Sequence, residues 1–259
     1  MNVLKIAIIG VAGVSSRFNK DIPEDEKILK CLYYEDSPED TLIYKLLEKC
    51  DYADNIIVIG GYKYDNLSDY INMSVPQNIK EKVTIVYNEH FSDLSSGYSL
   101  YLGIDCALNK FNGIDEILFV EGDLDIDNES FLKVVESSKN VLTFNHEPIY
   151  SNKAVIVYQN EKDEYCYLFN GDHGLLSLNE PFKAIFNSGQ TWKFRDMELL
   201  KKANDNFREN LIEDTNLAII QKYFDLLDDS DEIDIIGLDH WVNCNTRNDY
   251  RLIKNYWSE

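Results

Sequence analysis

The sequence has few cysteines, few prolines, few basic residues and no long apolar run. Its five cysteines lie far apart and form no CxxC pair, which argues against a zinc ribbon and a redox pair. No apolar run reaches the roughly 18 to 20 residues needed to span a bilayer. The 5 prolines and 12 glycines form no linker in the 259 residues, so we expect one domain over residues 1–259.

Basic residues are scarce: 25 lysines and arginines stand against 46 aspartates and glutamates, a formal net charge of −21. A nucleic-acid backbone requires a positive surface, so we expect no nucleic-acid partner. The N-terminal apolar run lacks the basic start and the cleavage site of a signal peptide, which predicts a cytoplasmic protein without membrane insertion. An anionic small substrate fits this composition only beside local lysines, arginines or a metal ion.

Strand-length apolar runs alternate with amphipathic segments through the first half. The runs at 3–9, 55–59, 83–87 and 116–120 predict buried strands, and helical periodicity appears at 42–50, 67–73 and 100–108. This rhythm indicates an α/β fold, a Rossmann-like, mostly parallel mixed sheet with helices on both faces. Expected strands at 154–158 and 165–169 indicate a small β-rich lobe in the second half.

The loop after the first strand has the composition of a phosphate-binding turn. Gly10 and Gly13 permit close approach of a ligand to backbone N–H groups. Ser15 and Ser16 add hydroxyls, and Arg17 adds a guanidinium that can bind phosphate through two hydrogen bonds. The loop matches neither the GxGxxG fingerprint nor a Walker A loop. Taken alone, it fits an ordinary strand-to-loop turn equally well.

An acidic stretch follows the fourth expected strand, at residues 121–127. Asp123, Asp125 and Asp127 have the spacing of a calcium loop, but Asn128 stands at the required glycine and Val134 at the closing glutamate. Because the stretch follows a buried strand, it is expected at the same sheet edge as the first loop. A carboxylate there can hold Mg²⁺ against nucleotide phosphates.

With these motifs in order, the chain resembles the nucleotidyltransferases that make NDP-sugars and related activated head groups. That family opens with Leu-Ala-Ala-Gly-x-Gly-Ser-Arg, matched by residues 10–17, and continues with Pro-Lys-x-Leu, matched by residues 29–32. Its metal aspartate corresponds to Asp123. Its Asn/Ser-x-Gly segment corresponds to residues 187–189, and its closing Trp-x-Glu-Ile-Asp-Thr element to residues 241–246.

The resemblance implies a set of site residues, with Mg²⁺ as cofactor. The expected catalytic residues are Lys30 and Arg17, and the expected metal ligands are Asp123 and Asn245. Asn245 also fits a turn or helix cap. The expected nucleotide-binding residues are Val11, Ala12, Gly13, Ser15, Ser16, Ser96 and Ser99. The expected acceptor-binding residues are Asp125, Asn187, Gly189 and Trp241.

Within the family, residues 98–102 before a predicted helix most resemble the CTP:phosphocholine cytidylyltransferases. This implies transfer of NMP from an NTP, CTP by this resemblance, to a small phosphorylated or phosphonylated acceptor such as phosphocholine, with release of pyrophosphate. Nucleotide is expected to bind in the half at about 1–125 and acceptor in the half at about 126–259. The sequence leaves a homodimer as one of the assemblies that the protein could form.

The chain departs from the family pattern at four places. Ser95-Ser96 replaces Asn-Asn, and Leu29 replaces the proline before the lysine. Ser15 replaces the second loop glycine, which a side chain tolerates only if φ there is negative. An acidic insert at residues 21–26 either repels phosphates or folds outward.

Three alternatives follow from the same residues. One is a sugar-1-phosphate nucleotidyltransferase, and another is a catalytically weak nucleotide-binding relative of the same fold. The third is a glycosyltransferase in which Asp123-Leu124-Asp125 serves as the Asp-x-Asp motif. Arg17 and Lys30 argue against the third, because a sugar-nucleotide donor needs no triphosphate clamp.

Overall fold

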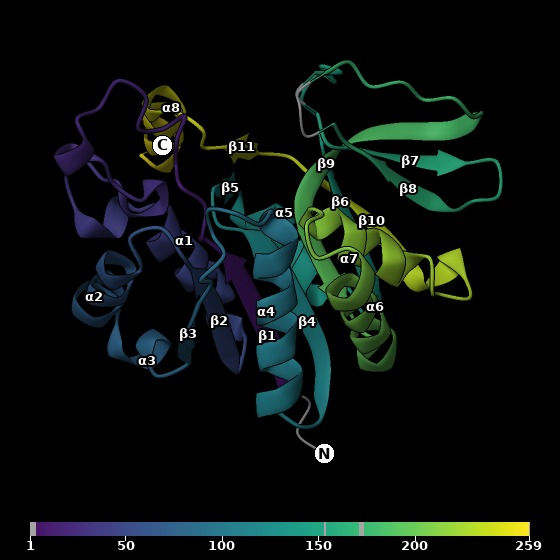
Figure 1. Ribbon diagram of the computed structural model, residues 1–259, viewed down its shortest axis with the longest axis horizontal. Coiled ribbons are helices and arrows are strands. Elements are labelled where there is room, and N and C mark those ends of the chain that lie inside the picture. The colour runs from purple at the N-terminus through teal and green to yellow at the C-terminus, as the bar shows by residue number, and fades with distance from the viewer. Residues whose placement is uncertain (1–3, 153, 171–173, 259) are drawn as a thin grey trace.

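The computed structural model describes residues 4–152, 154–170 and 174–258, and a mixed sheet runs through the middle of them (Figure 1). Its strand order is β10-β6-β9-β4-β1-β2-β3, and only β9 runs antiparallel to its neighbours β4 and β6. The strands of this path are β1 (Leu4–Gly10), β2 (Asn55–Gly60), β3 (Val83–Tyr87), β4 (Ile114–Glu121), β6 (Asn140–Asn145), β9 (Phe182–Phe194) and β10 (Ile233–Leu238). The predicted α/β class with a mostly parallel mixed sheet is confirmed.

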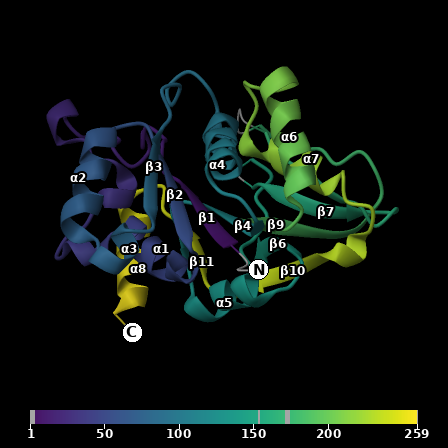
Figure 2. The ribbon, with the colours of Figure 1, turned by 90° about the horizontal axis from the view of Figure 1, so that it is seen from below.

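Helices cover both faces of the sheet, as Figure 2 shows from below. One face carries α1 (Leu42–Lys49), α2 (Tyr64–Ser74), α3 (Gln77–Lys80), α5 (Asn128–Glu136) and α8 (Arg247–Trp257). The other face carries α4 (Ser96–Lys110), α6 (Met197–Asn210) and α7 (Asn216–Phe224). In the described residues, none of these helices is long and apolar enough to cross a bilayer.

Because helices cover both faces of the sheet, the sequence of β1 is one continuous apolar run. Ala7 and Ile9 pack into the core on the α1 side, whereas Ile6 and Ile8 pack into the core on the α4 side. All four side chains are fully buried. Alternate residues of a strand point to opposite faces, so a strand covered on both faces requires apolar residues at every position.

The β-rich lobe expected in the second half is formed by β7 (Ile156–Asn160) and β8 (Tyr165–Leu168), which pair antiparallel. The first half of β9 pairs with β7, and its second half pairs with β4 and β6. The sequence analysis did not identify β9 or α6. A separate two-stranded sheet joins β5 (Leu124–Ile126) to β11 (Trp241–Asn243) and so brings the late chain to the end of β4.

Gly103 allows α4 to pack closely on β1. A Cβ at this position would lie 2.7 Å from Ile8 Cγ2 and 3.3 Å from Ile8 Cδ1. Helix propensity alone favours alanine over glycine by about 0.5–1 kcal/mol. Overpacking of a tight core costs about 1–3 kcal/mol, so we expect Gly103→Ala to lower the free energy of unfolding by roughly 1–2 kcal/mol. Urea denaturation measures this change, and a gain in stability would contradict the close approach.

Candidate active site

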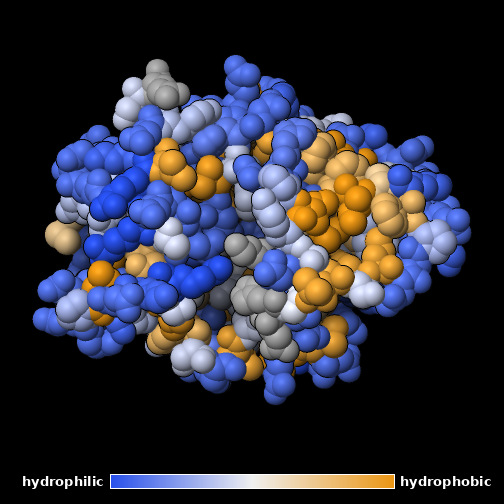
Figure 3. Space-filling view, turned by 90° about the horizontal axis from the view of Figure 1, so that it is seen from above, coloured by the Kyte–Doolittle hydropathy of each residue, from blue (hydrophilic) through white to orange (hydrophobic). Residues whose placement is uncertain are grey.

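A cavity of about 470 Å³ lies where β1 and β4 end. Its size is within the range of small-molecule sites, and the carboxyl edge of an open α/β sheet is where such sites form. Figure 3 looks onto this end of the molecule and shows a hollow near its centre, with polar surface on one side and an apolar patch on the other. The loop after β1, the turn after β4, the start of α4 and residues of β9 and β11 all contribute to its lining.

The loop after β1 forms one wall of the cavity. The Val11 N–H donates to the Ile59 carbonyl at 2.9 Å, and the Ala12 carbonyl accepts from the Tyr62 N–H at 3.0 Å. These two bonds tie the loop to β2. Gly13 also lines the cavity, and no atom lies within 4 Å of the position that a Cβ would take there. The loop therefore presents backbone to open space, as a phosphate-binding turn requires.

Ser15 departs from the expectation that its φ is negative: φ is +57°, in the left-handed region. The serine thus adopts a conformation that glycine enters without steric cost. Its Oγ accepts a hydrogen bond from the Lys30 backbone N–H at 3.1 Å. This bond joins the first loop to the Lys30 turn and offsets the strain that a Cβ meets at positive φ. Ser15 and Arg17 line the cavity, whereas Ser16 is exposed and does not.

Two substitutions of Ser15 distinguish the contribution of its hydrogen bond with the Lys30 N–H from the cost of its backbone strain. Ser15→Ala keeps the strain and leaves the Lys30 N–H without its partner, which costs about 1–3 kcal/mol. Ser15→Gly loses the same bond but relieves strain of about 1–2 kcal/mol. We therefore expect the glycine variant to be more stable than the alanine variant by roughly 1 kcal/mol in chemical denaturation. The reverse order would contradict the observed backbone conformation.

Lys30 and Asp123 meet across the cavity. The Lys30 ammonium donates to Asp123 Oδ2 at 2.5 Å, and both side chains are mostly buried. Leu29, in place of the family proline, has φ −67°, the value that a proline ring would impose. The acidic insert at residues 21–26 is mainly exposed and contributes nothing to the lining. The insert therefore folds outward, which is one of the two alternatives that the sequence left open.

Asp123 and Asn245 approach each other because β5 and β11 pair. The Cys244 N–H donates to the Asp123 carbonyl at 2.7 Å, and both predicted metal ligands line the cavity. The helix cap is Thr246, which forms a capping box with Asp249, so Asn245 does not serve as the cap. Asn245 Oδ1 is buried without a hydrogen-bond partner. One carboxylate and one free amide oxygen suit Mg²⁺, which prefers oxygen ligands and keeps several waters.

A cation at this point would depend on ligands beyond acidic side chains. Within the described ranges there is no group of three or more histidine, cysteine, aspartate or glutamate residues that could hold a metal ion. Acidic side chains therefore offer few metal ligands around Asp123. A cation held there would need further oxygen ligands from water or from a bound ligand.

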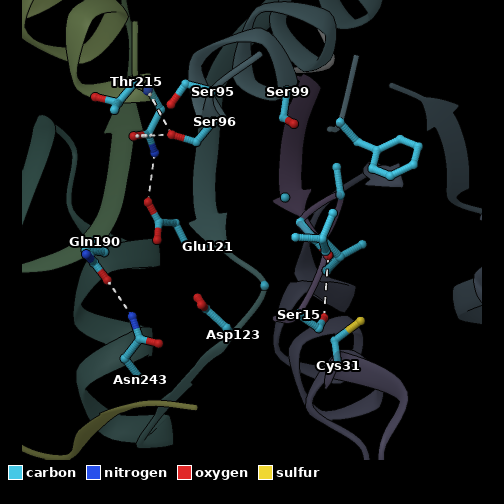
Figure 4. A pocket seen from close by; sticks show the side chains of 18 of the residues that line it. Ser15, Cys31, Ser95, Ser96, Ser99, Glu121, Asp123, Gln190, Thr215 and Asn243 are labelled. Atoms are coloured by element: carbon cyan, nitrogen blue, oxygen red, sulfur yellow. Dashed lines mark hydrogen bonds between the residues drawn. The ribbon is translucent and has the colours of Figure 1, made fainter. Parts of the chain in front are cut away.

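The start of α4 supplies hydroxyl groups to the opposite wall (Figure 4). Ser96 Oγ donates to Asn216 Oδ1 and accepts from the Asn216 N–H, both at 3.2 Å. Ser99 Oγ accepts from Asn88 Nδ2 at 2.9 Å. The predicted residues Ser96 and Ser99 are thus held in place by two buried asparagines, one from α7 and one after β3.

Sequence reasoning missed several lining residues, among them Glu121. Asn216 Nδ2 donates to Glu121 Oε1 at 2.8 Å. Burial raises the pKa of the Glu121 carboxyl to about 7, and the nearby Asp123 charge adds to this effect. Phe119 and Trp192 stack beside it, with ring centroids 5.5 Å apart. Glu121 begins the acidic stretch after β4, so the sequence could have indicated it as a lining residue. No local pattern indicated the lining residues of α7 and β9.

The structure does not bring the expected acceptor-binding residues into this cavity. Asp125 is buried on another side of β5, where its oxygens contact Trp257 Nε1 and His240 Nε2, each at 2.8 Å. Asn187 donates to Asn145 within the sheet. The Gly189 carbonyl accepts from Trp241 Nε1 at 2.9 Å. The neighbouring residues Gln190 and Asn243 line the cavity instead.

Comparisons with known proteins support the fold. A profile of the family described as "Domain of unknown function (DUF6564)" matches residues 26–257. No match was found among curated proteins. The structure resembles CTP:phosphocholine cytidylyltransferase from Streptococcus pneumoniae, with 16% identity, a TM-score of 0.61, and coverage of 98% of this chain and 100% of the other.

Two further solved structures have the same overall fold. The inositol-1-phosphate CTP transferase from T. maritima has 14% identity and a TM-score of 0.65, with coverage of 97% of this chain and 96% of the other. A UDP-glucose pyrophosphorylase complexed with UDP-glucose has 12% identity and a TM-score of 0.62, with coverage of 99% of each chain. At these identities the likeness establishes the fold, which is that of nucleotidyltransferases.

Proposed function

The chain belongs to the family described as "Domain of unknown function (DUF6564)", and we propose that it is a Mg²⁺-dependent nucleotidyltransferase. The reaction would transfer NMP from an NTP, in our proposal CTP, to a small phosphorylated or phosphonylated acceptor such as phosphocholine, and would release pyrophosphate. The observation that carries this proposal is the meeting of Lys30 and Asp123 in a cavity walled by the loop after β1.

The chemistry of such a transfer matches the side chains of the cavity. The attacking phosphate or phosphonate oxygen of the acceptor is already anionic, so no strong general base is required. An in-line attack on the α-phosphorus then needs orientation and neutralisation of charge. Lys30 and Arg17 provide positive charge within the cavity lining. A site of this kind needs no paired nucleophile and histidine.

We assign the nucleotide to the side of the cavity formed by the first loop and α4. Backbone N–H groups of residues 12–15 would bind phosphate oxygens beside Val11, and Ser96 and Ser99 would contact the nucleoside. Lys30 would contact the α-phosphate, and Arg17 the β- and γ-phosphates. Asp123 and Asn245 would hold Mg²⁺, which neutralises phosphate charge when bound. Lys30 would exchange its Asp123 partner for phosphate as the nucleotide enters.

The acceptor side of the cavity favours a cationic head group. Glu121 lines the cavity, and burial raises the pKa of its carboxyl group to about 7, so an ammonium group beside it would favour the charged form of this carboxyl group. The likeness to the CTP:phosphocholine enzyme agrees with this choice. A sugar-1-phosphate is the second candidate, because the UDP-glucose pyrophosphorylase structure is similar to the same degree.

A substrate matrix tests the proposal. Each of the four NTPs is combined with phosphocholine, phosphoethanolamine, aminoethylphosphonate and glucose 1-phosphate, and pyrophosphate release is measured. We expect the highest rate with CTP and an amine-bearing acceptor. Activity with glucose 1-phosphate alone would overturn the acceptor assignment but not the transfer reaction. Failure of every pair to release pyrophosphate would contradict both.

A further inference from the structure

Strand β9 contains a bulge where it passes the cavity. Between two matched pairs of residues, β6 has one residue, Thr143, whereas β9 has three, residues 189–191. Gln190, in the middle of this bulge, has φ +52°, which is uncommon for a residue with a Cβ. Gln190 also lines the cavity. Because bulges beside active sites often redirect a side chain, this one is a candidate for bringing Gln190 to a ligand.

Buried side chains hold the bulge in place. Thr143 Oγ1 donates to the Thr191 carbonyl at 2.7 Å and accepts from the Thr191 N–H at 3.2 Å. Ser188 Oγ accepts from the Gln190 N–H at 3.2 Å, and Asn145 Nδ2 donates to the Ser188 carbonyl at 2.9 Å. These bonds take the place of strand-to-strand bonds that the bulge interrupts. A strained conformation held so firmly by its surroundings is typical of ligand-binding positions.

The amide group of Gln190 has one end occupied and one end available. Asn243 Nδ2 donates to Gln190 Oε1 at 3.2 Å. Gln190 Nε2 carries two N–H donors, and no acceptor for them is found among the residues that the structure describes. In Figure 4, Gln190 and Asn243 lie on the opposite side of Asp123 from Ser15. Gln190 therefore offers hydrogen-bond donors on the side of the cavity away from the first loop.

An anionic acceptor would meet no basic side chain on this side of the cavity. Of the described residues in 126–259, none that lines the cavity is a lysine or an arginine. Lys30 and Arg17 lie on the other side and are assigned to the nucleotide, and Asp123 adds negative charge between the two sides. A phosphate or phosphonate group of the acceptor therefore depends on neutral hydrogen-bond donors and on the metal ion.

Gln190 is the best-placed donor among the polar side chains there. The described residues of 126–259 with polar side chains in the cavity lining are Gln190, Thr215, Asn216, Asn243 and Asn245. The amide nitrogens of Asn216 and Asn243 already donate within the protein. Asn245 is assigned to Mg²⁺. Thr215 lies beside Ser96 in Figure 4, at the wall assigned to the nucleoside. The Gln190 amide nitrogen has neither commitment.

We propose that Gln190 Nε2 donates a hydrogen bond to a non-attacking oxygen of the acceptor's phosphate or phosphonate group. The inference rests on the proposed function, because it concerns the acceptor of that reaction. A neutral donor suits this task, since a full positive charge would stabilise the attacking group before it reacts. Asn243 is a positioning residue in this arrangement, because its bond to Gln190 Oε1 leaves the amide nitrogen for the acceptor.

Gln190→Glu tests the inference by binding, without turnover. Glutamate has the same shape and keeps an oxygen for Asn243, but it lacks the two N–H donors. Calorimetry with Mg²⁺ present measures the affinity for phosphocholine and for choline, which has no phosphate. We expect the phosphocholine affinity to fall by about tenfold or more and the choline affinity not to fall. If another acceptor of the substrate matrix binds more tightly, it replaces phosphocholine, and its dephosphorylated form replaces choline.

Gln77→Glu is the matched control for the added negative charge. Gln77 is exposed on α3, contacts Glu81 at 2.8 Å and lies outside the cavity lining. This variant should bind phosphocholine and choline like the wild type.

Two further variants separate the lost donor from a change in stability. Gln190→Gly and Gln190→Ala both lack the amide, so both should lose phosphocholine affinity to the same extent. Gln190→Gly should have the higher urea midpoint of the two, because glycine adopts positive φ without steric cost. If Gln190→Glu does not fold, Gln190→Gly replaces it in the binding experiment.

Steady-state kinetics provide a readout that a merely structural role would not produce. With the Gln190→Glu variant, the KM for phosphocholine should rise by about tenfold or more, whereas the KM for CTP should not change. Equal rises in both constants would overturn the inference, because they would indicate a general disturbance of the cavity.

The outcomes separate this inference from the proposed function. Gln190 variants that bind phosphocholine like the wild type would overturn the inference, even if the protein releases pyrophosphate with some substrate pair. A wild-type protein that binds none of the acceptors in the matrix would also overturn it. Gln190-dependent binding of the phosphorylated acceptor in a protein that catalyses no transfer would support the inference and contradict the proposed function.

Discussion

Replacing Asp123 by alanine is expected to reduce nucleotidyl transfer by about 10³-fold or more at millimolar Mg²⁺. A metal ion contributes several kcal/mol of charge stabilisation in the transition state, and each 1.4 kcal/mol corresponds to tenfold in rate. Asp123 is the one carboxylate that we assign to the metal, and it also pairs with Lys30. Its loss therefore removes the metal ligand and leaves the lysine without its partner. Pyrophosphate release measures the effect.

Asp239→Ala is a suitable control for this experiment. Asp239 is well exposed, contacts Lys133 at 3.3 Å and lies outside the cavity lining. It should retain wild-type activity. Circular dichroism confirms that Asp123→Ala remains folded. Full activity in the Asp123→Ala variant, or in the wild type with excess EDTA, would contradict the metal assignment and most of the mechanism.

Replacing Lys30 by alanine is expected to lower turnover by about 10²–10³-fold, which corresponds to roughly 3–4 kcal/mol. We assign Lys30 to the α-phosphate, where charge develops as the acceptor attacks. An interaction of this kind strengthens in the transition state, so kcat should fall more than KM rises. Steady-state kinetics of pyrophosphate release over a range of nucleotide concentrations measure both constants.

Lys27→Ala provides the comparison for Lys30→Ala. Lys27 precedes the same turn, but it pairs with Glu24 at 2.5 Å and does not line the cavity. Its removal should leave kcat unchanged. If Lys30→Ala folds normally and retains near-normal turnover, Lys30 is not the residue that neutralises charge at the α-phosphate.

The sequence predicted the central part of the fold because its strands are covered on both faces. In β1, β2 and β4 the central residues are all buried, so each strand appears as an apolar run with a clear end. The ends of parallel strands meet at one edge of the sheet, which is why the loop after β1 and Asp123 after β4 were expected together. Their common lining of one cavity agrees with that expectation.

Residues placed by long-range pairing could not be predicted from local pattern. Asp123 lies in the turn between β4 and β5, so strand alternation does not relate it to Asp125. Asp125 instead contacts Trp257 and His240, more than a hundred positions along the chain. Gln190 reaches the cavity from the part of β9 where its pairing with β6 shifts register, and Asn243 reaches it through the pairing of β11 with β5. Nothing in their local sequence specifies those contacts.

Ser15 illustrates a limit of a different kind. The sequence argument held that a side chain at the family's second glycine requires negative φ, yet Ser15 has φ +57°. The argument considered the steric cost of the Cβ but not the hydrogen bond between Ser15 Oγ and the Lys30 N–H. That partner is distant in sequence, and its contribution becomes visible only when both loops are in place.

The most direct test of nucleotidyl transfer is a phosphorus NMR spectrum of a single reaction. The protein is mixed with Mg²⁺, CTP and phosphocholine, and the phosphorus signals are followed until the acceptor is consumed. The account predicts one pyrophosphate for each phosphocholine lost and a new pair of coupled signals from a P–O–P linkage, with no orthophosphate. Release of CDP and orthophosphate, or unchanged spectra here and with every other nucleotide and acceptor in the matrix, would contradict it.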